Sequence, residues 1–265
     1  MLSLQDLQAT EVVHITQDNM ADLMRFWSEV TKSFHLVEDD QCFRIKSSFP
    51  HPLFNNIIKS NFTTDIENHL NTIISNYNEN QVPFLWRVWN QDVPRNLGSL
   101  LLEKGAVQIS DCALMAIDLE TYHPMSEPLQ VLKIKTIRNP QHAFDFSKCC
   151  TSVFKIPIPL SKTISEIIGK QDQNIESFVG YIEGTPVATG TIFYSNGVAG
   201  IYNVATLPIF QGKGIGVEMM TTMLLKAKLD DIKTTILHAP AAGISLYEKL
   251  GFQNFGEMKQ YLFTN

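Results

Sequence analysis

A short glycine-rich segment, QGKGIG at residues 211–216, has the composition of an anion-binding turn. It lies between an apolar run that ends in VATLPIF and a long stretch with helical periodicity. A helix N-terminus leaves about four backbone N–H groups unpaired and carries a partial positive charge. The glycines at positions 212, 214 and 216 let a phosphate approach these amides without a Cβ in the way, and Lys213 adds a positive charge. The segment therefore predicts a site for a phosphate-bearing ligand.

The spacing argues against two common phosphate-binding loops. A Walker loop needs Gly-Lys followed by Ser or Thr, whereas here Gly214 follows Lys213. A dinucleotide fingerprint needs G-x-G-x-x-G, whereas the glycines here are spaced G-x-G-x-G. Asp230 and Asp231 are at a suitable distance to bind a ribose, but we expect them at the end of a helix rather than after a strand. A nucleotide-binding protein is therefore a poor fit.

A third pattern fits the segment. Gln211, Gly214 and Gly216 form Q-x-x-G-x-G, which resembles the acetyl-CoA-binding motif of the GNAT (GCN5-related N-acetyltransferase) superfamily. The stretch GISLYEKLGF, residues 243–252, resembles the last helix and turn of the same family. The resemblance covers about residues 130–265, and the first half resembles a degenerate GNAT domain, as in two-domain members of the family. It implies an α/β (α+β) fold with a mixed, mostly antiparallel sheet flanked by helices, in two tandem copies.

The length of 265 residues also favours two domains. The polar, proline-bearing stretch at 122–128 is interpreted as a linker. We therefore predict a degenerate GNAT-like domain at 1–125, with a possible role toward substrate or partner, and an acetyltransferase domain at 129–265. For the second domain, hydrophobic periodicity predicts strands at 131–137, 175–182, 186–195, 199–207, 233–239 and 252–263, and helices at 139–154, 159–169, from about 217 to 229 and at 241–251.

A faint internal repeat supports the two copies. The segment LLLEKGAVQISDCALMAIDL (100–119) aligns with LYEKLGFQNFGEMKQYLF (246–263) when Gly105 is placed opposite Gly251. At the same offset the glycine turn faces DIENHL, which contains no glycine, and Tyr247 faces a leucine. The first half is therefore predicted to lack both the turn and the hydroxyl.

The resemblance also implies how a cofactor is held. The strands at 199–207 and 233–239 would splay apart, and the pantetheine arm of acetyl-CoA would enter between them and pair with the backbone as an added strand. Backbone amides of the turn would hold the pyrophosphate. The cofactor-binding residues predicted in this way are Val204, Ala205, Thr206, Gln211, Gly212, Lys213, Gly214, Ile215 and Gly216.

The chemistry implied is direct attack of an amine on the acetyl thioester. It needs a neutral amine, a donor for the developing oxyanion and a proton for the leaving thiolate. A backbone N–H near Val204 is the predicted oxyanion donor, and Tyr247 matches the frequent general acid of the family. No carboxylate lies on the strand segment 201–203 to act as the base. His238 is interpreted as structural, and Ser245 as a possible cofactor contact.

The composition of the chain argues against several classes of binding partner. The net charge of −6 and the lack of a dense Lys/Arg block argue against nucleic acid and an anionic membrane, and no apolar run is long enough to span a bilayer. The start of the sequence has no secretory signal, so a cytoplasmic location with free thiols is expected. No metal site is predicted, since His35 beside Glu38, Asp39 and Asp40 has no second histidine at helical spacing.

Two functions remain open from the sequence. The first is an acetyl-CoA-dependent N-acetyltransferase acting on a small amine or on an amino group of a peptide or protein. The second is a non-catalytic acyl-CoA-binding or interaction module, which the missing strand carboxylate and the degenerate first half favour. No motif specifies the acyl acceptor, the general base, the role of the N-terminal half or the oligomeric state.

Overall fold

The computed structural model describes residues 1–125 and 127–264, and they form two compact units. The turn unit, which contains the glycine turn, consists of Met1–Leu7, Met115–His238 and Gly243–Asn254. The companion unit consists of Gln8–Leu114, Ala239–Ala242 and Phe255–Asn265. This division differs from the predicted boundaries of 1–125 and 129–265, because each chain end belongs to the unit formed mainly by the other half.

Hydrogen bonds explain why the two chain ends change units. In the turn unit, the Thr234 hydroxyl donates to the carbonyl of Leu2 over 2.8 Å. In the companion unit, strand β11 (Gln253–Phe263) pairs antiparallel with β4 (Phe84–Trp89) from Met258↔Trp89 to Phe263↔Phe84. Local sequence carries no signal for either pairing, since the partners are more than 150 residues apart.

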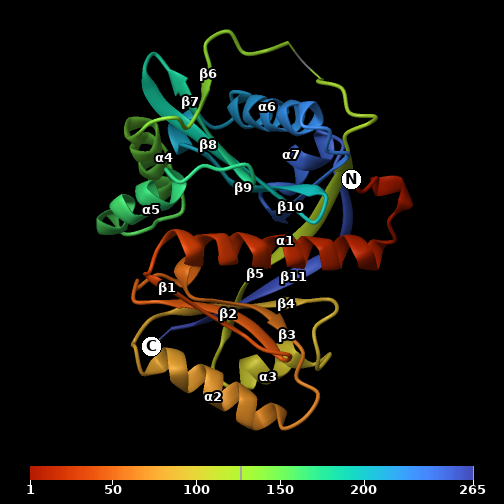
Figure 1. The fold of residues 1–265 in the computed structure, drawn as a ribbon, viewed down its shortest axis with the longest axis vertical. Coiled ribbons are helices and arrows are strands. Elements are labelled where there is room, and N and C mark those ends of the chain that lie inside the picture. The colour runs from red at the N-terminus through yellow and green to blue at the C-terminus, as the bar shows by residue number, and fades with distance from the viewer. Residues whose placement is uncertain (126, 265) are drawn as a thin grey trace. The chain divides into compact units, whose positions relative to one another are not determined.

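The turn unit has the element order predicted for it. Its strands neighbour one another in the order β10, β9, β8, β7, β6, all antiparallel except the parallel pair β9–β10 (Figure 1). Its elements after the connection are β6 (Lys133–Thr136), α4 (Pro140–Val153), α5 (Ser161–Ile168), β7 (Ile175–Ile182), β8 (Thr185–Ser195), β9 (Val198–Thr206), α6 (Ile215–Leu229), β10 (Thr234–Pro240, to His238 in this unit) and α7 (Ile244–Lys249).

Turn and packing chemistry explain the central strands. Both residues of Asn196-Gly197 have positive φ angles, 52° and 74°, which is the geometry of a two-residue hairpin turn. Helix α6 then packs on β8 through buried methionines, and it approaches Gly190 closely. A Cβ at Gly190 would lie 2.6 Å from the Met223 sulfur, so this strand position needs a glycine.

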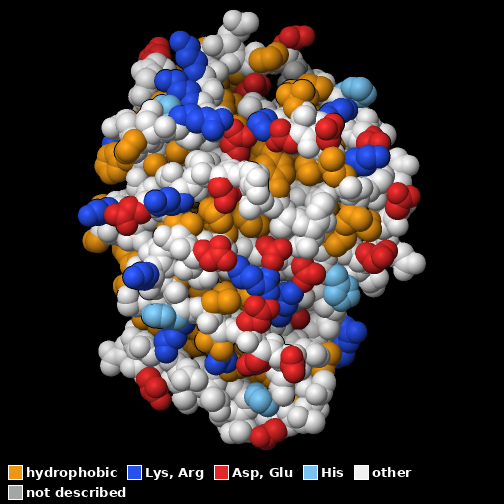
Figure 2. All heavy atoms as spheres, viewed as in Figure 1, with side chains coloured by type: hydrophobic (Ala, Val, Ile, Leu, Met, Phe, Trp, Pro, Cys, Tyr) orange, Lys and Arg blue, Asp and Glu red, His pale blue; other side chains and the backbone are white. Residues whose placement is uncertain are grey.

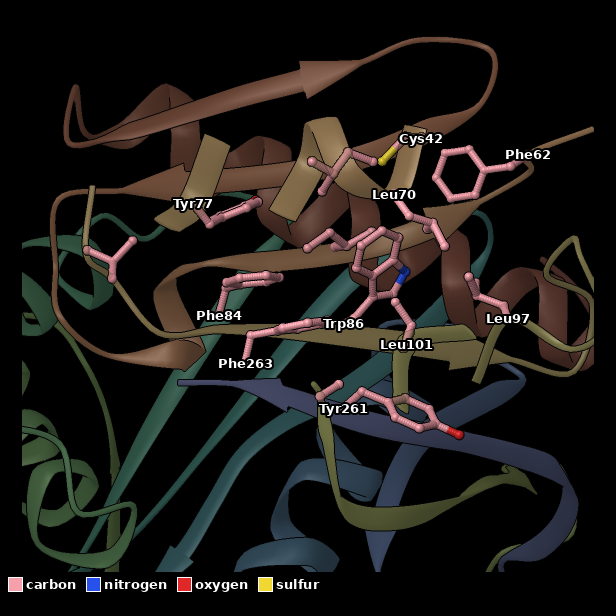
Figure 3. Close-up of a cluster of buried hydrophobic side chains, with 14 residues drawn as sticks. Cys42, Phe62, Leu70, Tyr77, Phe84, Trp86, Leu97, Leu101, Tyr261 and Phe263 are labelled. Atoms are coloured by element: carbon pink, nitrogen blue, oxygen red, sulfur yellow. The ribbon is translucent and has the colours of Figure 1, made fainter. Parts of the chain in front are cut away.

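The companion unit has its own sheet and core. Its strands are β1 (Phe34–Glu38), β2 (Cys42–Ser47), β3 (Asn56–Ser60), β4 and β11, neighbours in that order, and its helices are α1 (Ala9–Val30), α2 (Ile66–Asn78) and α3 (Leu97–Glu103). Strand β5 (Val107–Asp118) begins in this unit and ends in the turn unit. Figure 3 shows its buried cluster, in which Trp86 and Leu70 are 0% exposed.

The internal repeat reappears in the structure as the same element order. Gly105, with φ of 91°, follows α3 and precedes β5, just as Gly251, with φ of 97°, follows α7 and precedes β11. The starts of helices α2 and α6 do not align at the offset that aligns Gly105 with Gly251. Asp65, with φ of 48°, caps α2 as Gly214, with φ of 78°, caps α6, so Asp65 corresponds to Gly214 rather than to Gln211. The predicted offset fails there because the stretch from helix start to glycine is longer in the companion unit, 40 positions from Asp65 to Gly105 compared with 37 from Gly214 to Gly251.

Buried Asp92 in the companion unit makes stability depend on pH. Its carboxylate is 4% exposed, and burial raises its pKa to about 7 from 3.8. The folded state thus holds a proton that the unfolded state has lost, so stability falls as pH rises from about 4 to about 7 and is then flat. Between pH 5.5 and 8 we expect this group to lower the free energy of unfolding by about 2 kcal/mol. Urea unfolding at both pH values measures it.

The matched control for this prediction is Asp92→Asn, which holds an uncharged side chain at every pH. The difference in unfolding free energy between pH 5.5 and pH 8 should shrink by that amount in the variant, because all other titrating groups are unchanged. An equal pH dependence in both proteins would contradict the prediction.

Among the described residues, no helix combines the length and apolar character needed to cross a membrane, and no group of three or more His, Cys, Asp or Glu side chains has the arrangement of a metal site. On the face drawn in Figure 2, Lys and Arg side chains are interspersed with Asp and Glu side chains.

All four cysteines are buried and unbonded to one another, and burial raises the pKa of Cys149 and Cys150 to about 12 each. These thiols pack rather than react.

Candidate functional site

Among the described residues, the ladder between strands β9 and β10 ends part of the way along β9 and leaves the rest of that edge without a ladder partner. The parallel register runs from Ala199↔Thr235 only to Ile201↔Leu237, although β9 continues to Thr206. A bulge follows the separation, since the register with β8 shifts between Thr189 and Thr191 and Asn203 has a positive φ of 54°. A bulge bends a strand and increases its twist. It therefore helps to direct the second half of β9 away from β10.

Alternation along β9 shows which backbone groups face this free edge. The amide of Leu207 donates to the carbonyl of Val187 over 2.9 Å, so Leu207 and Ala205 direct their backbone groups toward β8. Val204 and Thr206 then direct theirs to the opposite side. Of the three residues predicted to pair with pantetheine, Val204 and Thr206 have the right orientation. Ala205 is 3% exposed and its backbone faces Thr189 instead.

The glycine turn is open to solvent. Residues 211–214 are exposed, and Gly212 and Gly214 have positive φ angles of 75° and 78°. Helix α6 begins directly afterwards at Ile215. Among the hydrogen bonds of the described residues, none is donated by the backbone N–H groups of residues 212–217. The N-terminus of this 15-residue helix thus presents a row of amide donors, and no side chain among the described residues caps them with a hydrogen bond.

The other residues of the turn hold its shape. The Gln211 side-chain amide donates to the carbonyl of Thr206 over 3.0 Å and so links the turn to the end of β9. Ile215 is 2% exposed and anchors the start of α6 in the core. The Lys213 ammonium lies 5.3 Å from the centre of the Phe210 ring, at the outer rim of the turn. Gln211 and Ile215 therefore position the amides, while Lys213 contributes charge beside them.

Removing the Gln211 side chain should loosen this link. We expect Gln211→Ala to weaken coenzyme A binding by about fivefold, which is the value of one hydrogen bond of about 1 kcal/mol. Calorimetric titration with coenzyme A measures the change. Gln173→Ala, at an exposed position before β7, is the matched control and should leave affinity unchanged. Equal affinity in wild type and Gln211→Ala would contradict the prediction.

The segment interpreted from the sequence as a linker is held along helix α6. Lys228 donates to the carbonyl of Tyr122 over 2.9 Å, and the Tyr122 hydroxyl donates to the Thr221 hydroxyl over 3.3 Å. At the other end of the helix, the amide of Leu129 donates to the Glu218 carboxylate over 3.3 Å. Ser126 lies outside the described residues. The linker prediction was wrong for Tyr122, which is 5% exposed and belongs to the core of the turn unit.

Leu129 and Glu218 are neighbours of the turn that sequence reasoning missed. A Cβ at Gly214 would lie 3.5 Å from the Leu129 side chain, so this leucine forms one wall of the turn. A glutamate in a helix's first turn is a common stabilising feature, and a leucine after Pro-rich sequence is unremarkable. Nothing in their local sequence predicts that they meet.

Tyr247 lies on α7 and is 7% exposed, with its ring edge-on to Phe252 at 5.8 Å between centroids. Among the described residues, no hydrogen bond involves its hydroxyl. Burial raises the pKa of Tyr247 to about 12. The phenol is therefore protonated at neutral pH, as a general acid must be, but its acidity is not increased by the ligand-free site.

Helix α7 lies beside the glycine turn, because a Cβ at Gly216 would lie 3.7 Å from the Leu246 side chain. His238 and Tyr202 are the residues next to the last parallel pair of β9 and β10, and their ring centroids are 5.9 Å apart. Ser245 is exposed on α7. The tertiary structure thus brings the turn, the free edge of β9 and the helix of Tyr247 together within one unit.

Comparison with known proteins finds similarity to acetyltransferases. Residues 173–254 match the family model of the acetyltransferase (GNAT) domain. An uncharacterized N-acetyltransferase, ycf52 of Gracilaria tenuistipitata var. liui, is 30% identical over 116 residues, which are 41% of this chain and 60% of the relative. The chain thus spans less than two thirds of that relative's length.

Two solved structures are similar over nearly the whole chain. A GCN5-related N-acetyltransferase from Kribbella flavida has a TM-score of 0.69 at 12% identity, covering 92% of this chain and 95% of that one. A tandem GNAT protein from the clavulanic acid biosynthesis pathway has a TM-score of 0.60 at 11% identity, covering 97% and 96%. At such identities the likeness concerns the fold. The predicted mixed, mostly antiparallel sheet flanked by helices, in a tandem arrangement, is confirmed.

Proposed function

We propose that this chain, whose residues 173–254 match the family model of the acetyltransferase (GNAT) domain, is a GNAT enzyme that transfers an acetyl group from acetyl-CoA to a primary amine. The observation that carries the proposal is the open row of amides at 212–217 beside the free edge of β9. In this proposal residues 129–265 supply the acetyltransferase part, and residues 1–125 are a degenerate copy with a role toward substrate or partner.

Coenzyme A has two kinds of polar group that match this surface. Its diphosphate is an anion that suits the amides of residues 212–217, with Lys213 beside them. Its pantetheine arm carries two amides in an extended chain, which suit the backbone amides of Val204 and Thr206 on the side away from β8 as an added strand does. With the diphosphate at the turn and the arm along β9, the thioester lies near the point where β9 and β10 separate.

The reaction then needs three functions at that point. The neutral amine nitrogen attacks the thioester carbon, and the N–H of Val204 donates to the carbonyl oxygen as it becomes negative. The carbon–sulfur bond breaks with its electron pair on sulfur. Tyr247 gives its proton to the thiolate and then regains a proton from solvent. The attacking nitrogen loses a proton to solvent, since segment 201–203 has no carboxylate.

The high pKa of Tyr247 makes proton transfer from this phenol to the leaving thiolate less favourable. A coenzyme A thiolate is the conjugate base of a thiol with pKa of about 8.5, so a phenol with pKa about 12 protonates it uphill in energy. Burial of the thiolate in the occupied cleft raises the thiol pKa and reduces this difference. The second candidate function, a non-catalytic acyl-CoA-binding module, is favoured by this pKa and by the missing carboxylate.

The test combines binding and turnover. Calorimetric titration with acetyl-CoA should give saturable binding, and a thiol-release assay over a panel of small amines and peptide amines should give turnover with at least one class. Binding without turnover for any amine would favour the non-catalytic module. If acetyl-CoA gives no binding heat and no amine gives turnover, the proposed donor site is refuted. ATP and NAD should not compete with coenzyme A at comparable affinity.

Acceptor class and location are part of the same proposal. We expect a small amine or an amino group of a peptide or protein as acceptor, a cytoplasmic location, and no nucleic acid or membrane partner. The mixed charges on the face in Figure 2 are compatible with this expectation. Acetylation of a protein lysate, followed by mass spectrometry of the modified amines, distinguishes peptide acceptors from small ones.

A further inference from the structure

In the companion unit β3 separates from β4 as β9 separates from β10, and the place of separation, here called the companion groove, is already occupied by another segment of the chain. Strands β3 and β4 pair in parallel at Asn56↔Leu85 and Ile57↔Trp86, and no further ladder pair of these strands follows among the described residues. The turn unit has the same arrangement, with Ile201↔Leu237 as its last parallel pair. In both units a helix then begins after the first of the two strands.

Val93 pairs with the edge at the end of β3, on the side where β3 has separated from β4. Its amide donates to the carbonyl of Ser60 over 3.1 Å, and its carbonyl accepts from the amide of Phe62 over 2.9 Å. Asn61 and Val93 form a parallel bridge. The chain thus adds a strand residue where pantetheine would add its amides.

The two edges correspond by position and direction. Ser60 and Phe62 follow the last paired residue, Ile57, by three and five positions. Val204 and Thr206 follow Ile201 by the same intervals. The amide of Asn61 donates to Gln41, next to β2, so Ser60 and Phe62 face away from that strand, as Val204 and Thr206 face away from β8.

Buried side chains hold the inserted segment, residues 90–94, in place. The Asp92 carboxylate accepts from the Trp89 amide and from the Gln17 side-chain amide, each over 3.0 Å. Gln17 is 5% exposed and also donates to the carbonyl of Ile58 over 3.1 Å. It therefore joins β3 to the inserted segment. Because Gln17 and Asp92 are both buried, releasing the segment would break a buried hydrogen bond between them as well as the two backbone bonds of Val93, which is costly.

The far end of this groove is closed to phosphate as well. The connection before α2 has five residues between β3 and the helix, compared with eight between β9 and α6. Asp65 takes the place of Gly214, and Glu67 lies in the first turn of α2. Lys104 pairs with Glu67 over 2.6 Å, while the Asp65 carboxylate remains at the cap, where an anionic ligand would need donors. Phe62 is 1% exposed and packs 6.1 Å from the Trp86 ring, within the cluster of Figure 3.

We propose that the companion unit's acyl-CoA groove is permanently occupied by Val93 of the same chain, so that the protein binds one acyl-CoA per chain, in the turn unit alone. The location of the bound molecule rests on the proposed function. The closure of the companion groove does not, because its bonds are present without a ligand.

Hydrogen exchange of individual amides tests the closure. In the ligand-free protein, the amides of Phe62 and Val93 should be protected like the amide of Leu85, which donates to Asn55 within the β3–β4 ladder. The amides of Val204 and Thr206 should exchange fast. Saturation with acetyl-CoA should slow the second pair at least tenfold and leave the first pair unchanged. Fast exchange of Phe62 and Val93 in the ligand-free protein would overturn the closure.

Native mass spectrometry with acetyl-CoA tests the stoichiometry. Wild type should bind one molecule per chain, and Gly216→Asp, which places a carboxylate among the turn amides, should bind none. Two molecules per chain, or one remaining in Gly216→Asp with new protection at residues 60–65, would overturn the inference. If wild type binds none, the proposed function fails, while slow exchange of Phe62 still supports the closed groove.

Discussion

Gly216→Asp should abolish coenzyme A binding while leaving the fold intact. Gly216 lies in the first turn of α6, and a Cβ there meets only Leu246 and Thr206 at 3.7 and 3.8 Å, which are ordinary contact distances. An aspartate at this place accepts from the free amides and interacts favourably with the helix N-terminus, so stability should be kept or raised. The same carboxylate competes with the diphosphate for the same donors and repels it.

Two unit charges about 4 Å apart near a protein surface repel by about 4 kcal/mol, and salt reduces this value. We therefore expect the dissociation constant for coenzyme A, measured by calorimetry, to rise at least about 100-fold. The matched control is Gly216→Asn, which has nearly the same shape without the charge and should weaken binding by less than about tenfold. Unchanged affinity in Gly216→Asp would place the diphosphate elsewhere and remove the basis of the proposed function.

Tyr247→Phe should reduce kcat by about 100- to 1,000-fold, the range expected for loss of a general acid, with little change in coenzyme A affinity. The variant keeps the ring that packs against Phe252, and among the described residues the lost hydroxyl has no hydrogen-bond partner. Thermal stability should therefore be unchanged. Steady-state thiol release with the best amine of the panel measures the effect.

The matched control is Tyr122→Phe. Tyr122 is a buried tyrosine of the same unit, but its hydroxyl donates to Thr221 on α6 rather than lying free. This variant should cost a little stability and leave kcat unchanged. If both variants, or neither, lower kcat, Tyr247 is not the acid, and coenzyme A binding without dependence on Tyr247 would favour the non-catalytic module.

The pH profile gives a second measurement on Tyr247. With its pKa raised to about 12 by burial, the phenol keeps its proton throughout the practical range, so it should cause no falling limb of kcat/KM below about pH 11. Activity should instead rise with pH as the amine substrate loses its proton. A falling limb near pH 8 to 9 that disappears in Tyr247→Phe would contradict the buried, high-pKa phenol.

Local sequence determined the glycine turn and the element order of the turn unit. Residues 211–216 needed no distant partner to be interpreted, because positive φ angles at Gly212 and Gly214 and the free amides of a helix start are local properties. The same holds for the hairpin turn at Asn196-Gly197 and for Gly105 and Gly251 after their helices. Hydrophobic periodicity and the residue preferences of turns depend on only a few neighbouring residues, so both can be recognised directly in the sequence.

Only the tertiary structure decided which groups of the site are available. Alternation along β9 shows that the backbone groups of Val204 and Thr206 point to the same side of the strand. Only the pairing of β9 with β8 on the opposite side shows that their side is the free one. In the same way, Val93 fills the companion groove, and Tyr122 belongs to a core rather than a linker. These outcomes depend on contacts between residues from 16 positions apart, for Thr189 and Ala205, to 106 positions apart, for Tyr122 and Lys228. Such contacts are selected by packing of the whole sheet and leave no local pattern.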